Sequence, residues 1–190
     1  MLNRLTYSPC KYLLFALMAG VLMSFTSVRN DDGTTPDLHV IRKLLITALE
    51  SKKTTDSLYK SLGAIKDRPA LINAYMATLE ALKAKHAWNP YYKIRYLNDS
   101  EKTFKTAVAA DPRNIEIRFM RFSIEHNVPK FLGYTKNLVT DREEIIKQIN
   151  AKYYAQADKA LVKTIIKFLL ESKRCTAAEQ KNLTQHLAAL

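Results

Sequence analysis

Glycine is scarce in this chain, with four in 190 residues, where average usage of about 7% would give roughly 13. The four are widely separated, at positions 20, 33, 63 and 133. Phosphate-binding loops, dinucleotide fingerprints and nucleophile elbows need closely spaced residues that tolerate positive φ or close backbone approach, and these are usually glycine. The sequence therefore lacks such loops, and we expect an all-α fold.

Cysteine is almost absent as well. Of the two cysteines, Cys10 lies in the N-terminal leader, so removal of the leader would leave Cys175 without a partner for an internal disulfide. We expect Cys175 to be buried as a small apolar residue. The alternative is a disulfide to another chain.

Acidic residues are absent before Asp31, and this stretch has the pattern of a secretory signal peptide. Arg4 and Lys11 precede an apolar run at 12–23, which is followed by small polar residues. The run is too short for a spanning helix, which needs about 20 apolar residues. We expect residues 1–27 to be cleaved near Thr26 or Ser27, and the alternative is a retained anchor.

The expected signal peptide leads to a prediction of the domain organisation and the location of the chain. The polar segment 28–37 predicts a linker, followed by a single helical domain at 38–190. A signal peptide predicts an exported protein of the periplasm or cell envelope, and we expect a monomer.

Positive charge exceeds negative charge throughout the sequence. The formal net charge of +12 falls to +10 without residues 1–27, and the excess is spread evenly over the remainder. An even excess predicts a generally cationic surface and no nucleic-acid partner. Weak contact with an anionic membrane or polysaccharide surface is the further expectation.

Helical periodicity dominates the sequence after residue 37. Apolar residues recur at spacings of three and four, and we expect eight or nine helices and no strand. Caps are expected at Asp56 or Thr54, at Asp67 before Pro69, at Asn89 before Pro90, at Asn114, at Asp141 with Glu144, and at Thr176 with Glu179. Residues 98–100 could interrupt one helix, and a short helix is expected around 131–138. The periodic stretch that follows could form one long helix, but we expect two helices with a bend between Asn150 and Gln156.

One segment resembles the end of a tetratricopeptide repeat. Phe104, Ala107 and Pro112 match the aromatic, small and terminal proline positions of that repeat, although Ala84 stands where tryptophan is usual. The resemblance implies helices stacked as antiparallel pairs. More broadly, the mature chain resembles a group of uncharacterised exported proteins of Bacteroidota-type bacteria, which implies an envelope location.

Catalytic and metal-binding motifs are not found. The four histidines are 40 or more residues apart and no HExxH or cysteine pair occurs, so we expect no metal and no cofactor. No serine or cysteine has an identifiable base, and no pair of carboxylates is singled out. We therefore expect a protein that is not an enzyme, with an envelope hydrolase as the alternative.

Two clusters are candidate partner-binding sites. Arg118 and Arg121 are three residues apart and can point from one helix face toward a carboxylate. That carboxylate belongs either to a partner or to this chain, at Glu116, at Glu125 or on a neighbouring helix. Tyr92 and Tyr96 share a helical stripe with Trp88, which favours either core packing or a binding face. The leading hypothesis is an interaction module that binds a protein or peptide, because stacked helices offer extended surfaces.

Overall fold

The computed structural model of the chain describes residues 37–154 and 157–190, and within them it confirms the expected all-α fold. Eight α-helices and one 3₁₀ turn account for the regular structure of these residues, which contain no strand. The expected signal peptide, its cleavage site and most of the linker lie outside the described residues. The helices are α2 (Leu38–Ala48), α3 (Lys52–Gly63), α4 (Ala70–His86), α5 (Pro90–Ala110), α6 (Ile115–Asn127), η1 (Lys130–Leu132), α7 (Leu138–Asn150), α8 (Lys159–Glu171) and α9 (Ala177–Ala189).

Several helix starts occur where the sequence placed them. The Asn89 side chain accepts a hydrogen bond from the Tyr91 amide, and the Asn114 side chain accepts from the Glu116 and Ile117 amides. Thr176 caps α9 in a reciprocal capping box with Glu179. These side chains satisfy amides that have no partner within the helix, which is why the cap residues marked these helix starts in the sequence.

Other boundaries differ from expectation. Ser51 caps α3, ahead of the expected Asp56 or Thr54. Helix α5 runs without interruption through residues 98–100. The expected short helix is the η1 turn, which ends at Gly133 with φ of +80°, a conformation that glycine adopts without strain. Helix α7 begins three residues before Asp141. The expected division of the long periodic stretch into two helices is confirmed, because α7 ends at Asn150 and α8 begins at Lys159.

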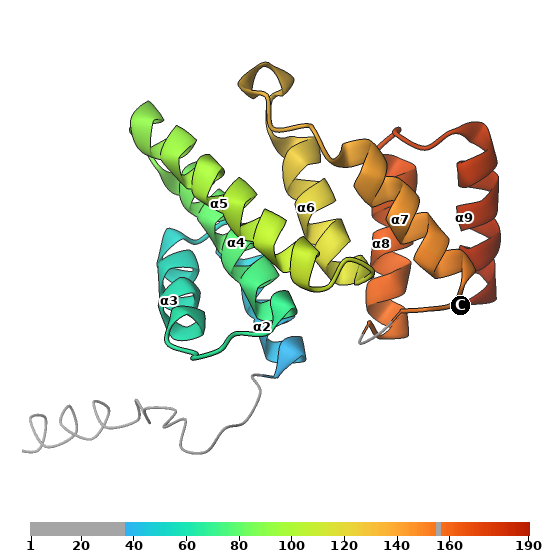
Figure 1. Cartoon of the computed structure of the whole chain (residues 1–190), viewed down its shortest axis with the longest axis horizontal. Coiled ribbons are helices and arrows are strands. Elements are labelled where there is room, and N and C mark those ends of the chain that lie inside the picture. Colours follow the sequence, from blue (N-terminus) through green and yellow to red (C-terminus); the bar gives the residue numbers. More distant parts are fainter. Residues whose placement is uncertain (1–36, 155–156) are drawn as a thin grey trace, which may run out of the picture. The chain divides into compact units, whose positions relative to one another are not determined.

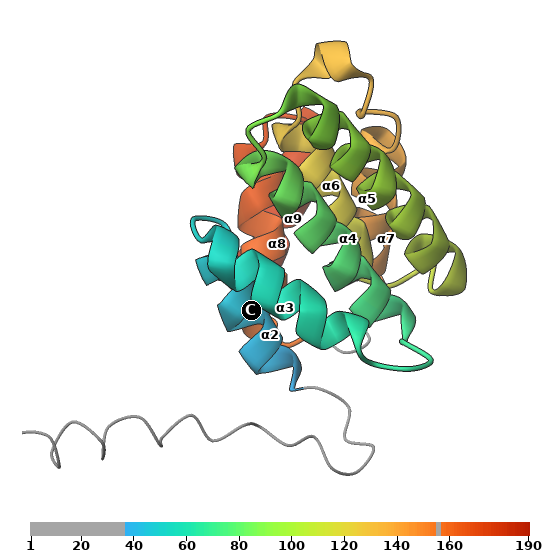
Figure 2. The ribbon, with the colours of Figure 1, turned by 90° about the vertical axis from the view of Figure 1, so that its left-hand side faces the viewer.

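Short turns join the helices of two neighbouring pairs. Three residues separate α2 from α3 and α4 from α5, so the two helices of each pair are antiparallel. In both views α4 lies between α3 and α5 (Figures 1 and 2). Tyr75, Leu79 and Phe104 are fully buried in the core that α2 to α6 share.

Helix α6 belongs to two cores. Ile117 and Met120 pack into the core formed with α2 to α5, whereas Ile115 and Phe122 pack into a second core with α7, α8 and α9. Figure 1 shows α6 between these two groups of helices. Four charged residues of α6 are consequently buried: Glu116, Arg118, Arg121 and Glu125.

Candidate functional site

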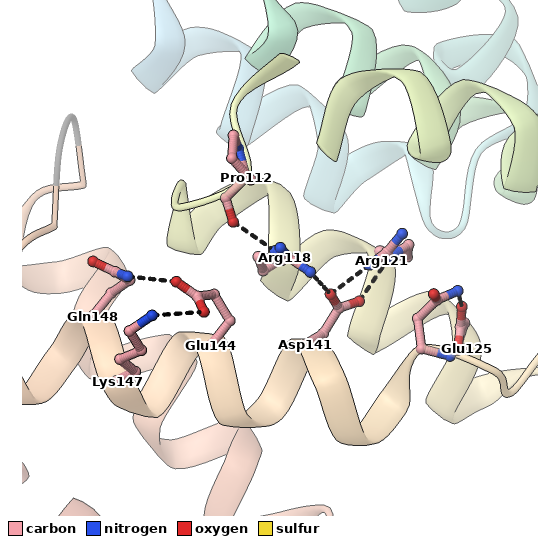
Figure 3. Close-up of polar contacts among 9 residues, drawn as sticks. Pro112, Arg118, Arg121, Glu125, Asp141, Glu144, Lys147 and Gln148 are labelled. Carbon is pink, nitrogen blue, oxygen red and sulfur yellow. Dashed lines mark hydrogen bonds and ion pairs between the residues drawn. The ribbon is translucent and has the colours of Figure 1, made fainter. Parts of the chain in front are cut away.

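The candidate arginines on α6 are buried against α7. Arg118 is 9% and Arg121 is 8% exposed, and the Asp141 residue that they contact is fully buried. Arg118 Nη1 donates to Asp141 Oδ1 at 2.9 Å, while Arg121 donates through Nη2 to Oδ1 at 2.6 Å and through Nε to Oδ2 at 2.7 Å. In Figure 3 the Asp141 carboxylate points from α7 toward both guanidinium groups.

Two further contacts at this junction lie within the chain. Arg118 Nε donates to the Pro112 carbonyl at 2.8 Å, which ties α6 to the turn before it. The Glu125 carboxylate accepts hydrogen bonds from the backbone amide and the side chain of Asn137, the residue immediately before α7. This anion lies at the positive end of the α7 dipole, where it is stabilised. Burial nevertheless raises the pKa of Glu125.

These contacts favour the structural interpretation of Arg118 and Arg121 over the binding of a partner's carboxylate. Their carboxylate partner is Asp141 of the same chain, one of the two partners considered from the sequence, so a second molecule would have to displace a buried ion pair to reach them. The arrangement is suited to joining α6 to α7. A buried ion pair of this kind fixes how two helices sit together more than it adds stability.

A second buried network joins α2 to α6. Arg42 grips Glu116 with two bonds, Nε to Oε1 at 2.8 Å and Nη2 to Oε2 at 2.6 Å, and the Tyr75 hydroxyl donates to the same carboxylate. Hydrogen bonding to Glu116 raises the pKa of Arg42, and burial raises the pKa of Tyr75. Arg42 also reaches Asp158, which caps α8, at 3.2 Å. These charged groups are all satisfied inside the fold.

The tyrosine stripe lies instead at an open groove. Tyr92 is 45% exposed and Tyr96 is partly buried, so neither is core packing alone. The two rings stack with centroids 6.4 Å apart, and Tyr91 meets Tyr92 edge to face at 5.5 Å. The groove has a volume of about 570 Å³ and is formed by α3, the end of α4, the turn after it and the start of α5, with these lining residues: Lys52, Asp56, Lys83, His86, Ala87, Trp88, Asn89, Tyr92 and Tyr96.

Trp88 stands at the mouth of this groove and is 99% exposed. Tryptophan is highly buried on average, and it dominates binding energy where it meets a partner. The turn that carries Trp88 is held on both sides, because His86 Nε2 donates a hydrogen bond to the Ala48 carbonyl at 2.9 Å and Asn89 caps the next helix. The groove therefore presents an aromatic face on a restrained turn.

Lysines in the groove have different surroundings. Lys52 Nζ pairs with Asp56 at 2.5 Å across one turn of α3. The Lys83 ammonium lies over the Tyr59 ring, 4.0 Å from its centroid, and 5.2 Å from the centroid of Tyr96. Lys83 was not singled out as a binding residue from the sequence, because its ring contacts come from two other helices and no local spacing reveals them.

A second cleft surrounds Glu80 on the side of α4 that faces α5. Glu80 is 8% exposed, its Oε1 accepts from the Tyr59 hydroxyl at 3.3 Å, and its Oε2 has no partner among the described residues. Burial raises the pKa of Glu80. A carboxyl group with a raised pKa can act as a general acid. However, Oε2 has essentially no accessible surface, so it could not touch a substrate in the cleft.

The described residues also bear on metal and thiol chemistry. They contain no group of three or more histidine, cysteine or acidic side chains placed to hold a metal ion. Cys175 is buried, as expected, and burial raises the pKa of its thiol, which lowers its reactivity. None of the helices among these residues is both long and apolar enough to cross a membrane.

Comparison with known proteins gives no relative from which a function could be transferred. No protein-family model, no curated protein and no solved structure matches this chain. The function must therefore be argued from the groove itself.

Proposed function

We propose that this chain is an exported helical module that binds a protein or peptide partner in the bacterial envelope, and that the groove around Trp88 is its binding surface. The observation that carries the proposal is the nearly complete exposure of Trp88 beside an open groove. An exposed tryptophan next to a concave, partly aromatic surface is typical of a binding site that lacks its partner.

The occupant that fits is an extended or helical peptide segment of another protein. The groove runs between helices, and its floor and walls combine the rings of Tyr92 and Tyr96 with polar groups of Lys83 and Asp56. In such a site, an apolar side chain of the bound peptide packs on an aromatic ring, and the polar groups of the groove fix the orientation of the peptide. The burial of Phe104 and Ala107 supports a tetratricopeptide-like arrangement, because these residues match the aromatic and small packing positions of that repeat. Both residues lie on α5, the helix that also carries the tyrosines.

The test begins with site-specific photo-crosslinking in the exported protein. A photoreactive residue at Tyr92 is compared with one at Val139, which is 55% exposed on α7 and does not line the groove. A discrete adduct at position 92 and none at 139 identifies the partner. Equal adducts at both positions would mean nonspecific contact with a cationic surface.

Binding of the purified partner segment is then measured by fluorescence. Trp88 is the single tryptophan of the chain, so its emission reports on the groove alone. We expect a saturable blue shift as the partner excludes water from the ring, and Trp88→Ala should weaken binding, measured calorimetrically, by about 30-fold, as expected for loss of a hot-spot residue of about 2 kcal/mol. The proposal fails if the segment leaves the emission unchanged, or if binding vanishes between low and moderate salt as for a purely ionic surface contact.

A further inference from the structure

Lys83 sets the chemistry of the groove, and the inference drawn from it rests on the proposed function. Its ammonium is held over Tyr59, 4.0 Å from the ring centroid, with Tyr96 at 5.2 Å. Within the described part of the chain Lys83 forms no ion pair with a carboxylate. Lys52, the other lysine of the groove, is already matched by Asp56 at 2.5 Å.

This difference leaves one excess positive charge inside the groove. The two aromatic rings restrict the Lys83 side chain, so an arriving anion meets an ammonium group whose position is already fixed. A cation held in place binds an anion more strongly than a freely moving one, because less side-chain entropy is lost on binding. Glu80, one turn before Lys83 on α4, accepts a hydrogen bond from Tyr59 and forms no ion pair with Lys83. Burial raises the pKa of Glu80, and this effect outweighs the opposite influence of the nearby Lys83 charge.

From this geometry we propose that the groove selects a peptide segment with a carboxylate next to an apolar or aromatic side chain. The carboxylate pairs with Lys83, and the neighbouring side chain packs against Trp88 and Tyr92. A single excess cation matches a single carboxylate, whereas a polyanion such as nucleic acid is bound by several cations in a row.

The probe is a library of random dodecapeptides displayed on phage, selected in parallel on the wild-type chain and on the Trp88→Ala, Lys83→Met and Lys83→Arg variants. Lys105→Met is the matched control, because Lys105 is an exposed lysine of α5 outside the groove. Circular dichroism checks that every variant remains folded. Wild-type selections should be enriched in aspartate or glutamate beside aromatic or aliphatic residues.

Each selected acidic peptide is then synthesised in three forms. One has a free C-terminus, one has a C-terminal amide, and one has its aspartate or glutamate replaced by asparagine or glutamine. Lys83→Met should weaken binding of the acidic form by at least about tenfold, as expected for loss of a charge-assisted hydrogen bond. Lys83→Arg should retain most of the affinity, and Lys105→Met should leave it unchanged. Loss of binding on C-terminal amidation alone would assign the carboxylate to the peptide terminus.

Two different failures can be told apart. Peptides that bind wild type and Lys83→Met equally, or show no acidic enrichment, overturn the role of Lys83 and leave the groove as a peptide site. A library that yields nothing above the Trp88→Ala background overturns the proposed function itself.

Discussion

Replacement of Asp141 by asparagine should expose the dependence of α6 on its buried partner. The change keeps the side-chain shape but removes the only negative charge that contacts Arg118 and Arg121 among the described residues. The side chains of these two arginines are only 11% and 10% exposed. Removing one partner of a buried ion pair leaves an uncompensated charge and costs about 3–5 kcal/mol. For a domain of this size, where 1 kcal/mol shifts Tm by about 2–4 °C, we expect Tm to fall by about 6–20 °C.

The assay is urea unfolding followed by far-ultraviolet circular dichroism. Tryptophan fluorescence is unsuitable, because Trp88 is already exposed in the folded protein. Glu143→Gln is the matched control on the same helix, since that side chain is 61% exposed. It should change the free energy of unfolding by no more than about 0.5 kcal/mol.

A loss of less than about 1 kcal/mol for Asp141→Asn, with an unchanged urea dependence, would refute this reasoning. A second variant keeps the test valid if the asparagine protein does not fold. Joint replacement of Arg118 and Arg121 by methionine and of Asp141 by leucine removes every charge of the cluster. Apolar replacement of a buried ionic cluster is often neutral or stabilising, so this variant should recover most of the stability.

Three further predictions concern packing, capping and pH. Phe104→Ala removes a residue that is 1% exposed and should lower the free energy of unfolding, measured with urea, by about 3–5 kcal/mol. A much smaller loss would contradict this and would mean that the core collapses into the vacated space. Thr176→Ala removes the cap of α9 and should lower the free energy of unfolding by about 1 kcal/mol in the same measurement. An unchanged free energy of unfolding would contradict this and would mean that the start of α9 frays in solution. Burial and the nearby Arg174 lower the pKa of His126 from its ordinary value of 6.5, so the unfolded chain binds a proton more readily than the folded one. The contribution of His126 to stability is therefore present above pH 6.5 and is lost as the pH falls through the pKa that His126 has in the folded protein. The Tm of His126→Gln should fall less steeply with acidification than the Tm of the wild type. Equal slopes would contradict this prediction.

Local signals in the sequence predicted the helical architecture well. Asn89, Asn114 and Thr176 act as caps through atoms two or three residues away, which a linear pattern captures. The same polar residue types were misleading at residues 98–100, because their hydrogen bonds are tertiary. The Ser100 hydroxyl donates to the Ala77 carbonyl of α4 at 2.8 Å, and Asn98 accepts from the Tyr134 hydroxyl at 2.6 Å.

The candidate site was harder to predict, for a related reason. The sequence placed Arg118 and Arg121 on one helix face, but it assigned Asp141 to a capping box that would have left the carboxylate occupied. Only the packing of α7 against α6 brings that carboxylate to the arginines, across 20 or more residues of chain. Likewise, the ring beneath Lys83 comes from Tyr59 on α3, so the charge that distinguishes the groove has no local sequence pattern.

The membership of α6 in both cores has a consequence for the cooperativity of unfolding. In a solenoid, terminal repeats can unfold while the remainder stays intact, because each repeat contacts only its neighbours. Here Ile117 and Met120 stabilise one group of helices, while Ile115 and Phe122 on the same helix stabilise the other. Loss of α6 would open both cores at once, so amides in α4 and in α8 should exchange with solvent at similar rates through one shared global opening.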